Sequence, residues 1–190
     1  MRRFSPFLLF GCLWLPVGLS AQEKDLTAAS LPEFLARYEE NLGPLARLFA
    51  ELANEDLALR DEMGRPLGRR PLDDRRQALT DLRATLRELA ANPQDLVLTV
   101  RFYVQGETLT DDLFDLSLIA YDNDREELGK HFSDYEVTMD RNQDRLESYV
   151  LSLAADKQER LGELEKEIRE LQQELKQAVK RPKAEPSRRP

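Results

Sequence analysis

The only histidine of the chain, His131, sits among carboxylates at helical spacing. Asp124, Glu127 and Asp134 lie seven and four residues before it and three residues after it, so a helix would place all four side chains on one face. An imidazole with carboxylates is a donor set that divalent cations accept. Helical bundles that hold metals take their ligands from facing helices through Glu-x-x-His pairs, a motif absent from this sequence. We therefore interpret these residues as a solvated acidic face and expect no metal or cofactor.

Two short runs resemble the start of a calcium-binding loop. A calcium loop of this kind needs glycine at its sixth position and glutamate at its twelfth. The run 122–126 leads instead to Glu127 and Ser133, and the run 140–144 ends on Leu151. We interpret both runs as polar helix surface.

A third group of carboxylates comprises Asp111, Asp112 and Asp115, close in sequence to Glu107. Paired carboxylates catalyse acid–base reactions when a cleft shifts the pKa of one of them. Here the simpler interpretation is negative charge in the first turn of a helix. The chain also lacks a G-x-S-x-G motif and a phosphate-binding glycine loop. We expect no enzymatic activity.

The first 21 residues have the layout of a secretory signal. Arg2 and Arg3 precede an apolar run over residues 7–15, and Ser20 and Ala21 offer small residues before a cleavage point. Two alternatives are an uncleaved membrane anchor, for which the run is short, and a lipoprotein signal ending at Cys12. Cys12 is the only cysteine, so a chain cleaved after residue 21 would have no disulfide. We expect export to the periplasm or cell envelope.

Charge is distributed unevenly along the chain. The net charge is −8 for the whole sequence, whereas residues 22–179 hold 21 Lys and Arg against 35 Asp and Glu, a net of −14. Such an acidic body argues against nucleic-acid binding, which requires a basic surface. The end, residues 181–190, contains three prolines and should be a disordered basic tail. Its Arg181, Lys183, Arg188 and Arg189 would allow weak contact with anionic envelope components.

The elements that must position these residues are helices. After a flexible leader at 22–29, Ser30 and Glu33 form a capping box, and a stripe of apolar residues at alternating spacings of four and three continues through Gly43 and Pro44. It predicts a kinked helix, or two coaxial pieces, ending near Asp61. A loop with a basic island (Arg65, Arg69 and Arg70) follows, and then a second helix from Leu72 to Ala91.

Residues 94–122 fit two patterns. From 96 to 104, apolar and polar residues largely alternate, as in a strand. A helical pattern also fits and continues better downstream, and no second strand is available to pair with the first. We predict helix, with an interruption near Gly106 or Thr110.

The most informative feature is a helical stripe over residues 124–180. Its apolar spacing changes between Leu153 and Leu161, where Lys157 takes the intervening position. Beyond that point a narrow seam continues through Leu161, Leu164, Ile168, Leu171 and Leu175. Such a seam requires another helix against it. Three occupants are open: the first helix of the same chain in a hairpin, a second copy, or a helix of another protein.

These observations predict an all-α protein, an antiparallel helical bundle (30–156) whose long C-terminal helix projects as a coiled-coil extension (157–180). The layout resembles small exported helical proteins with coiled-coil arms, such as periplasmic chaperones. The first functional hypothesis is protein–protein interaction in the bacterial envelope, as a scaffold or chaperone-like protein. The alternative is a ligand- or metal-binding helical sensor.

Overall fold

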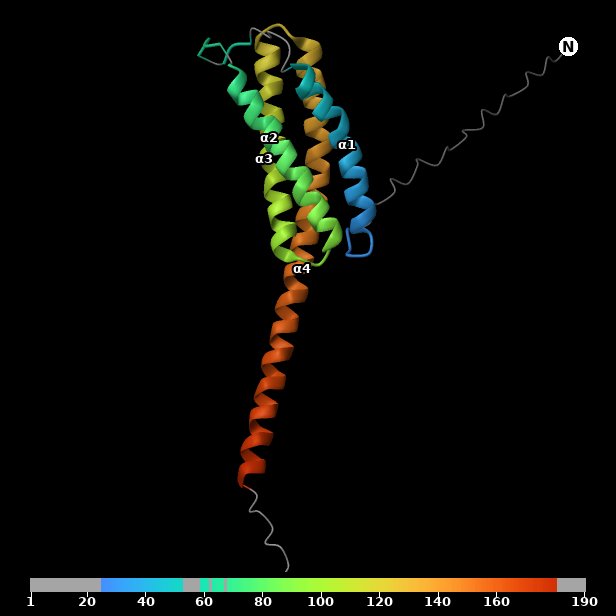
Figure 1. The fold of residues 1–190 in the computed structure, drawn as a ribbon, viewed down its shortest axis with the longest axis vertical. Coiled ribbons are helices and arrows are strands. Elements are labelled where there is room, and N and C mark those ends of the chain that lie inside the picture. Colours follow the sequence, from blue (N-terminus) through green and yellow to red (C-terminus); the bar gives the residue numbers. More distant parts are fainter. Residues whose placement is uncertain (1–24, 53–58, 62, 67, 181–190) are drawn as a thin grey trace, which may run out of the picture.

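The described part of the protein is a helical bundle with one long projection (Figure 1). The computed structural model describes residues 25–52, 59–61, 63–66 and 68–180. Over these ranges it contains α1 (Leu31–Leu52), α2 (Arg69–Ala91), α3 (Leu96–Asp122) and α4 (Glu126–Lys180), and no strand beyond an isolated bridge between Arg60 and Pro66. The expectation of an all-α bundle with a long C-terminal helix is confirmed.

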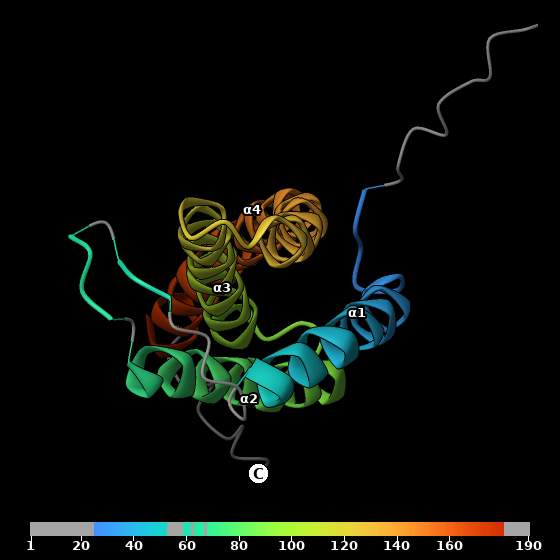
Figure 2. The ribbon, with the colours of Figure 1, turned by 90° about the horizontal axis from the view of Figure 1, so that it is seen from above.

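The four helices run alternately up and down (Figure 1). Seen along the bundle, α3 lies beside α4, and α2 lies between α3 and α1 (Figure 2). This is the antiparallel arrangement that the short α2–α3 and α3–α4 connections favour. The expected signal (1–21) and basic tail (181–190) lie outside the described residues. Among the helices that are described, none is long and apolar enough to cross a membrane.

The beginning and end of α1 differ from expectation. Residues 25–29 are not a free leader, because Leu26 is buried in the core and the hydroxyl of Ser30 bonds to the backbone of Thr27. Pro44 lies inside the helix, as expected. The helix does not reach Asp61: it ends at Leu52, and residues 59–61 are not helical. The apolar stripe itself stops at Leu52, and the prediction placed the helix end nine residues beyond it.

The core is built from the apolar stripes of all four helices, and its largest side chains come from α1, α3 and α4. The rings of Tyr38 and Phe102 lie 4.9 Å apart, and those of Phe49 and Phe132 lie 6.2 Å apart. All four rings are almost completely buried. Aromatic side chains of this size bridge α1 to helices whose backbones lie farther away.

Helices α2 and α3 begin differently. Helix α2 begins at Arg69, three residues earlier than expected, so part of the basic island belongs to its first turn. Helix α3 is continuous from Leu96 and is capped by Asp95, whose side chain accepts a bond from the Leu98 amide. The helical interpretation of 94–122 is confirmed. The expected interruption is absent: α3 runs unbroken through Gly106 and Thr110. The buried Thr110 hydroxyl donates to the Gly106 carbonyl of the same helix, so Thr110 needs no capping role to satisfy it.

Gly106 allows α3 and α4 to approach closely. A Cβ atom built there would lie 1.5 Å from Nε2 of Gln143 and 2.9 Å from the Tyr38 hydroxyl. Gln143 and Tyr38 are 2% and 1% exposed, and the Gln143 amide donates to the Tyr38 hydroxyl at 3.4 Å. These residues form a small polar layer inside an otherwise apolar core.

Helix α4 is a single helix of 55 residues. It begins at Glu126 and not at Asp124, because Asp124 has φ of 57° and turns the chain. Its last core side chain is Leu153. The outer seam resumes at Leu161, eight residues later, and eight residues at 3.6 per turn leave the new seam rotated by about 80° around the helix.

Candidate functional site

The strongest candidate site is the part of α4 that leaves the bundle, residues 155–180, which we call the arm (Figure 1). At 1.5 Å per residue it is about 40 Å long. Every side chain described there, from 155 to 177, is exposed. The five residues predicted to form the seam are between 39% and 66% exposed: Leu161, Leu164, Ile168, Leu171 and Leu175. Their spacing places them on one face of the helix.

The first of the three possible occupants, the chain's own first helix, is excluded by this geometry. Helix α1 lies inside the bundle, and α4 runs on past the start of α1 (Figure 1). The hairpin alternative is therefore wrong. Helix α1 cannot cover the arm because its own apolar seam already packs into the core, where Leu31, Leu35 and Leu42 are buried.

The other faces of the arm carry charged residues at helical spacing. Arg160 lies 3.1 Å from Glu163, and Arg169 lies 3.8 Å from Glu165. All four side chains are at least 60% exposed, so these pairs contribute little to stability. Because most helical stability in proteins comes from packing an apolar face, a helix of this length with an uncovered leucine seam is suited to binding another helix.

The base of the arm is held firmly by the bundle. The hydroxyl of Tyr149 donates to the Pro93 carbonyl at 2.7 Å, and Leu153 packs into the core one turn later. A cavity of about 340 Å³ at this point is lined partly by Gln94 and Lys157. The direction of the arm is therefore fixed by contacts at the bundle end.

A second apolar surface was missed in the sequence. Besides its core face, helix α3 has an outer strip of apolar residues at spacings of three and four, with one gap of ten. Its members are between 39% and 68% exposed: Val97, Val100, Val104, Phe114, Leu118 and Tyr121. Two carboxylates, Glu107 and Asp111, continue the same spacing in the middle of the strip. The alternating pattern that resembled a strand was the available signal, since it reflects apolar residues on both faces of α3.

The carboxylates named as candidates do not converge on one cleft. Asp112 pairs with Arg75 of α2 at 3.0 Å. Glu107 lies instead toward α4. Its pKa is raised mainly by burial and further by the negative charges of Asp111, Asp140 and other nearby acids. Burial also raises the pKa of Asp112, against the opposing charge of Arg75. Because Asp112 pairs with α2 and Glu107 lies toward α4, the two carboxylates do not form a catalytic pair.

The metal and calcium hypotheses have no geometric support in the described part of the chain. No group of three or more metal-binding side chains is found there. His131 and Asp134 border a cavity of about 320 Å³ together with Asn41 and Thr138. The run 140–144 lies within α4, and a continuous helix cannot wrap its side chains around one ion.

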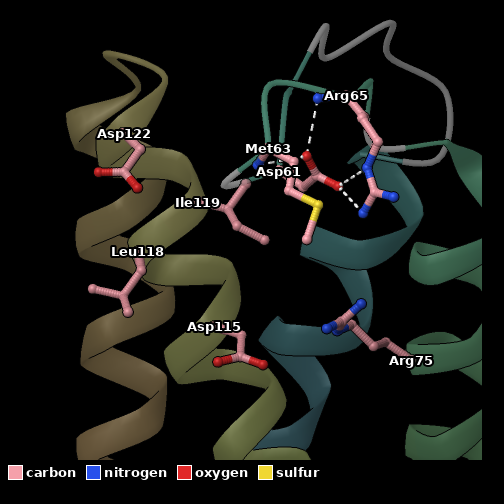
Figure 3. Close-up of a pocket in the computed structure, with 8 residues that line it drawn as sticks. All are labelled: Asp61, Met63, Arg65, Arg75, Asp115, Leu118, Ile119 and Asp122. Atoms are coloured by element: carbon pink, nitrogen blue, oxygen red, sulfur yellow. Dashed lines mark hydrogen bonds and ion pairs between the residues drawn. The ribbon is translucent and has the colours of Figure 1, made fainter.

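A small cavity of about 320 Å³ lies at the opposite end of the bundle from the arm (Figure 3). Met63, Leu118 and Ile119 give it an apolar part, and carboxylates at 61, 115 and 122 surround it. Arg65 bonds to Asp61 through its backbone amide and its guanidinium, and these bonds lower the pKa of the Asp61 carboxyl.

The loop beside this cavity is tied to the end of α3. The Asn123 side chain accepts from the Arg60 amide at 3.0 Å and donates to the Arg60 carbonyl at 2.9 Å. The cavity is at the lower end of the size range of ligand sites. Comparison with protein-family models, curated proteins and solved structures finds no match.

Proposed function

We propose that this chain is an exported helical protein of the bacterial cell envelope that acts through protein–protein contacts made by its arm, as a scaffold or chaperone-like protein. The observation that carries the proposal is the exposed seam from Leu161 to Leu175 on a helix that continues about 40 Å beyond its bundle. The layout of residues 1–21 supports export. The proposed work is binding, without a reaction centre.

The arm is a separable binding element because the core ends before it. Removing residues 157–190 leaves every core side chain in place, since the last of them is Leu153. We expect the truncated protein to keep its helical bundle and its cooperative unfolding. It should lose the proteins that crosslink in living cells to the full chain.

A matched control separates the seam from the rest of the arm. Replacing Leu164 and Leu171 by glutamate should abolish the same crosslinks, whereas replacing Lys166 and Gln173 on the opposite face by glutamate should not. Retention of all crosslinked proteins by both the truncated chain and the seam variant would refute this function. Export is tested separately, by fractionation and by sequencing the mature N-terminus, which we expect at Gln22.

The second candidate is a ligand-binding sensor, and the cavity between the 59–66 loop and α3 favours it (Figure 3). Its lining combines apolar side chains with three carboxylates and with the guanidinium groups of Arg65 and Arg75, which suits a small polar compound with an apolar part. A thermal-shift screen of purified protein against such compounds and divalent metals tests it. A Leu118→Arg variant serves as the control for the cavity, and His131→Ala serves as the control for metal binding.

A further inference from the structure

We propose that the arm binds a second copy of this chain, parallel and in register, as a two-stranded coiled coil. This inference rests on the proposed function and names the partner for it. The helix face is uncovered in the single chain, so the question is which helix matches it. The positions of the apolar and charged side chains along the arm answer that question.

The apolar seam of the arm is self-complementary. In the heptad repeat, Leu161, Ile168 and Leu175 occupy the first core position (a), and Leu164 and Leu171 occupy the second (d). Two parallel arms in register bring each of these residues against its own copy, which gives five consecutive apolar layers. Ile168 at a, followed by Leu171 at d, is the combination that favours two parallel strands, whereas the other two a positions hold leucine.

The charged residues beside the seam favour the parallel arrangement. In a parallel pair, each g residue lies near the e residue five positions later in the other helix. Arg160 of each copy then faces Glu165 of the second copy, which gives two opposite-charge pairs. Glu167 faces the uncharged Gln172. This register contains no like-charge contact between flanking residues from 160 to 172.

Antiparallel registers are less favourable. When two antiparallel arms overlap fully, so that Ile168 meets Leu171, Glu167 of each copy lies against Glu174 of the second copy. Sliding the arms by one heptad pairs Arg160 with Glu174 instead. The same register places Glu165 and Glu167 each against its own copy and Lys157 opposite a leucine. Like charges at these positions oppose association, so charge selects the parallel form.

The cost of a parallel pair is that the two acidic bundles lie at the same end. Residues 25–153 hold 15 Lys and Arg against 27 Asp and Glu. Physiological salt screens charges beyond about 8 Å, and helical bundles are wider than this distance. Lys157, at the core position nearest the bundle, would meet its own copy and end the coil there. The contact therefore begins at Leu161 and not within the bundle.

Disulfide trapping tests the orientation directly. A Cys12→Ser background makes each introduced cysteine the only one in the chain. Leu161→Cys and Leu175→Cys should each form a disulfide-linked dimer of a single variant, because a parallel register places identical residues together. In the antiparallel registers the two copies of residue 161 would be at least about 15 Å apart along the axis. The outward-facing Lys166→Cys variant is the matched negative control.

A mixture of Leu164→Cys and Leu175→Cys chains provides the opposite test. These positions meet in the fully overlapped antiparallel register and lie eleven residues apart in the parallel one. We expect homodimers of each variant and no mixed disulfide. A mixed disulfide in place of the homodimers would overturn the parallel arrangement.

Charge reversal tests the recognition without adding a thiol. Arg160→Glu should weaken dimerisation by roughly tenfold, because two attractive contacts become repulsive. The double variant Arg160→Glu with Glu165→Arg should restore most of it. Dimerisation is measured by sedimentation equilibrium, with helix content as the control for folding of the arm. Equal association of all three proteins would overturn the assigned pairing.

The failure of this inference can be told apart from the failure of the proposed function. A full chain that sediments as a monomer and forms no disulfide at Leu161→Cys would overturn self-association. If that monomer still requires its seam to crosslink other proteins in cells, the proposed function stands with a different partner. If the seam is dispensable there as well, both proposals are wrong.

Discussion

Replacing Gly106 by alanine should destabilise the protein, although the same change usually stabilises a helix. In an unhindered helix interior, alanine is favoured over glycine by about 1 kcal/mol. At Gly106 the new methyl group would meet Nε2 of Gln143 at 1.5 Å and its Cδ at 2.6 Å, against an optimal carbon separation of about 3.5 to 4.0 Å. The Gln143 side chain must therefore move by about 2 Å.

The surroundings of Gln143 leave it no open direction in which to move. It is 2% exposed, and the Tyr38 hydroxyl to which it donates is also buried. Overpacking a core costs about 1 to 3 kcal/mol, and losing the hydrogen bond costs about 1 kcal/mol more. After the helix gain is subtracted, we expect Gly106→Ala to lower the free energy of unfolding by about 1 to 3 kcal/mol.

Urea denaturation followed by circular dichroism measures this change, with Gly162→Ala as the control. Gly162 also lies inside a helix, α4, but a methyl group added there would have no neighbouring atom within 4 Å, so its replacement should be neutral or slightly stabilising. Combining Gly106→Ala with Gln143→Ala removes the two nearest clashing atoms and leaves, of the three nearest, only the Tyr38 hydroxyl at 2.9 Å. The double variant should therefore be less destabilised than the sum of the two single changes. A Gly106→Ala protein as stable as the Gly162→Ala protein would refute the close approach of α3 and α4.

Three further predictions concern single contacts. Glu107→Gln should stabilise the protein at neutral pH. Burial raises the pKa of the Glu107 carboxyl in the folded protein above its ordinary value of 4.5. Ionisation of Glu107 therefore opposes folding increasingly as the pH rises from 4.5 through the raised pKa. Thermal unfolding should show that advantage vanishing below pH 4.5, and an advantage independent of pH would contradict the assignment. Asn123→Ala should release the loop at Arg60 and speed proteolysis there, with the rest of the bundle protected. Tyr149→Phe should lower the free energy of unfolding by about 1 kcal/mol in urea titrations, because the Pro93 carbonyl loses its donor.

The helices and the arm follow from local sequence patterns, and for that reason they could be predicted. Spacings of three and four residues record which face of a helix meets the core, and the eight-residue step from Leu153 to Leu161 records where that core stops. The exposed seam of the arm was predictable for the same reason. Both features depend on residues within one or two turns of each other.

The features that could not be predicted join residues far apart in the chain. From the sequence, Gly106 predicts only a weak point in a helix. The structure shows that Gln143 and Tyr38 pack against it and leave no space for a side chain. From the sequence, Asn123 predicts only a helix end. Its two hydrogen bonds to Arg60 form because the loop that contains Arg60 lies against the end of α3. The end of α1 was predictable, because its apolar stripe stops at Leu52, and the prediction of an end near Asp61 went beyond that stripe. The outer strip of α3 was hidden by a composition that is apolar on two faces.

If the arm binds a helix as proposed, the eight-residue step from Leu153 to Leu161 sets the direction in which that helix lies, independently of how strongly it binds. Deleting one residue between Leu153 and Leu161 would leave every leucine in the helix but would turn the outer stripe by about 100° relative to the bundle. A bound helix would swing around the axis by the same amount and reach a different side of the four-helix body. The number of residues between Leu153 and Leu161 would thus set the direction of a bound helix relative to the bundle. Small insertions there would change that direction and leave the seam contacts, and so the affinity, unchanged.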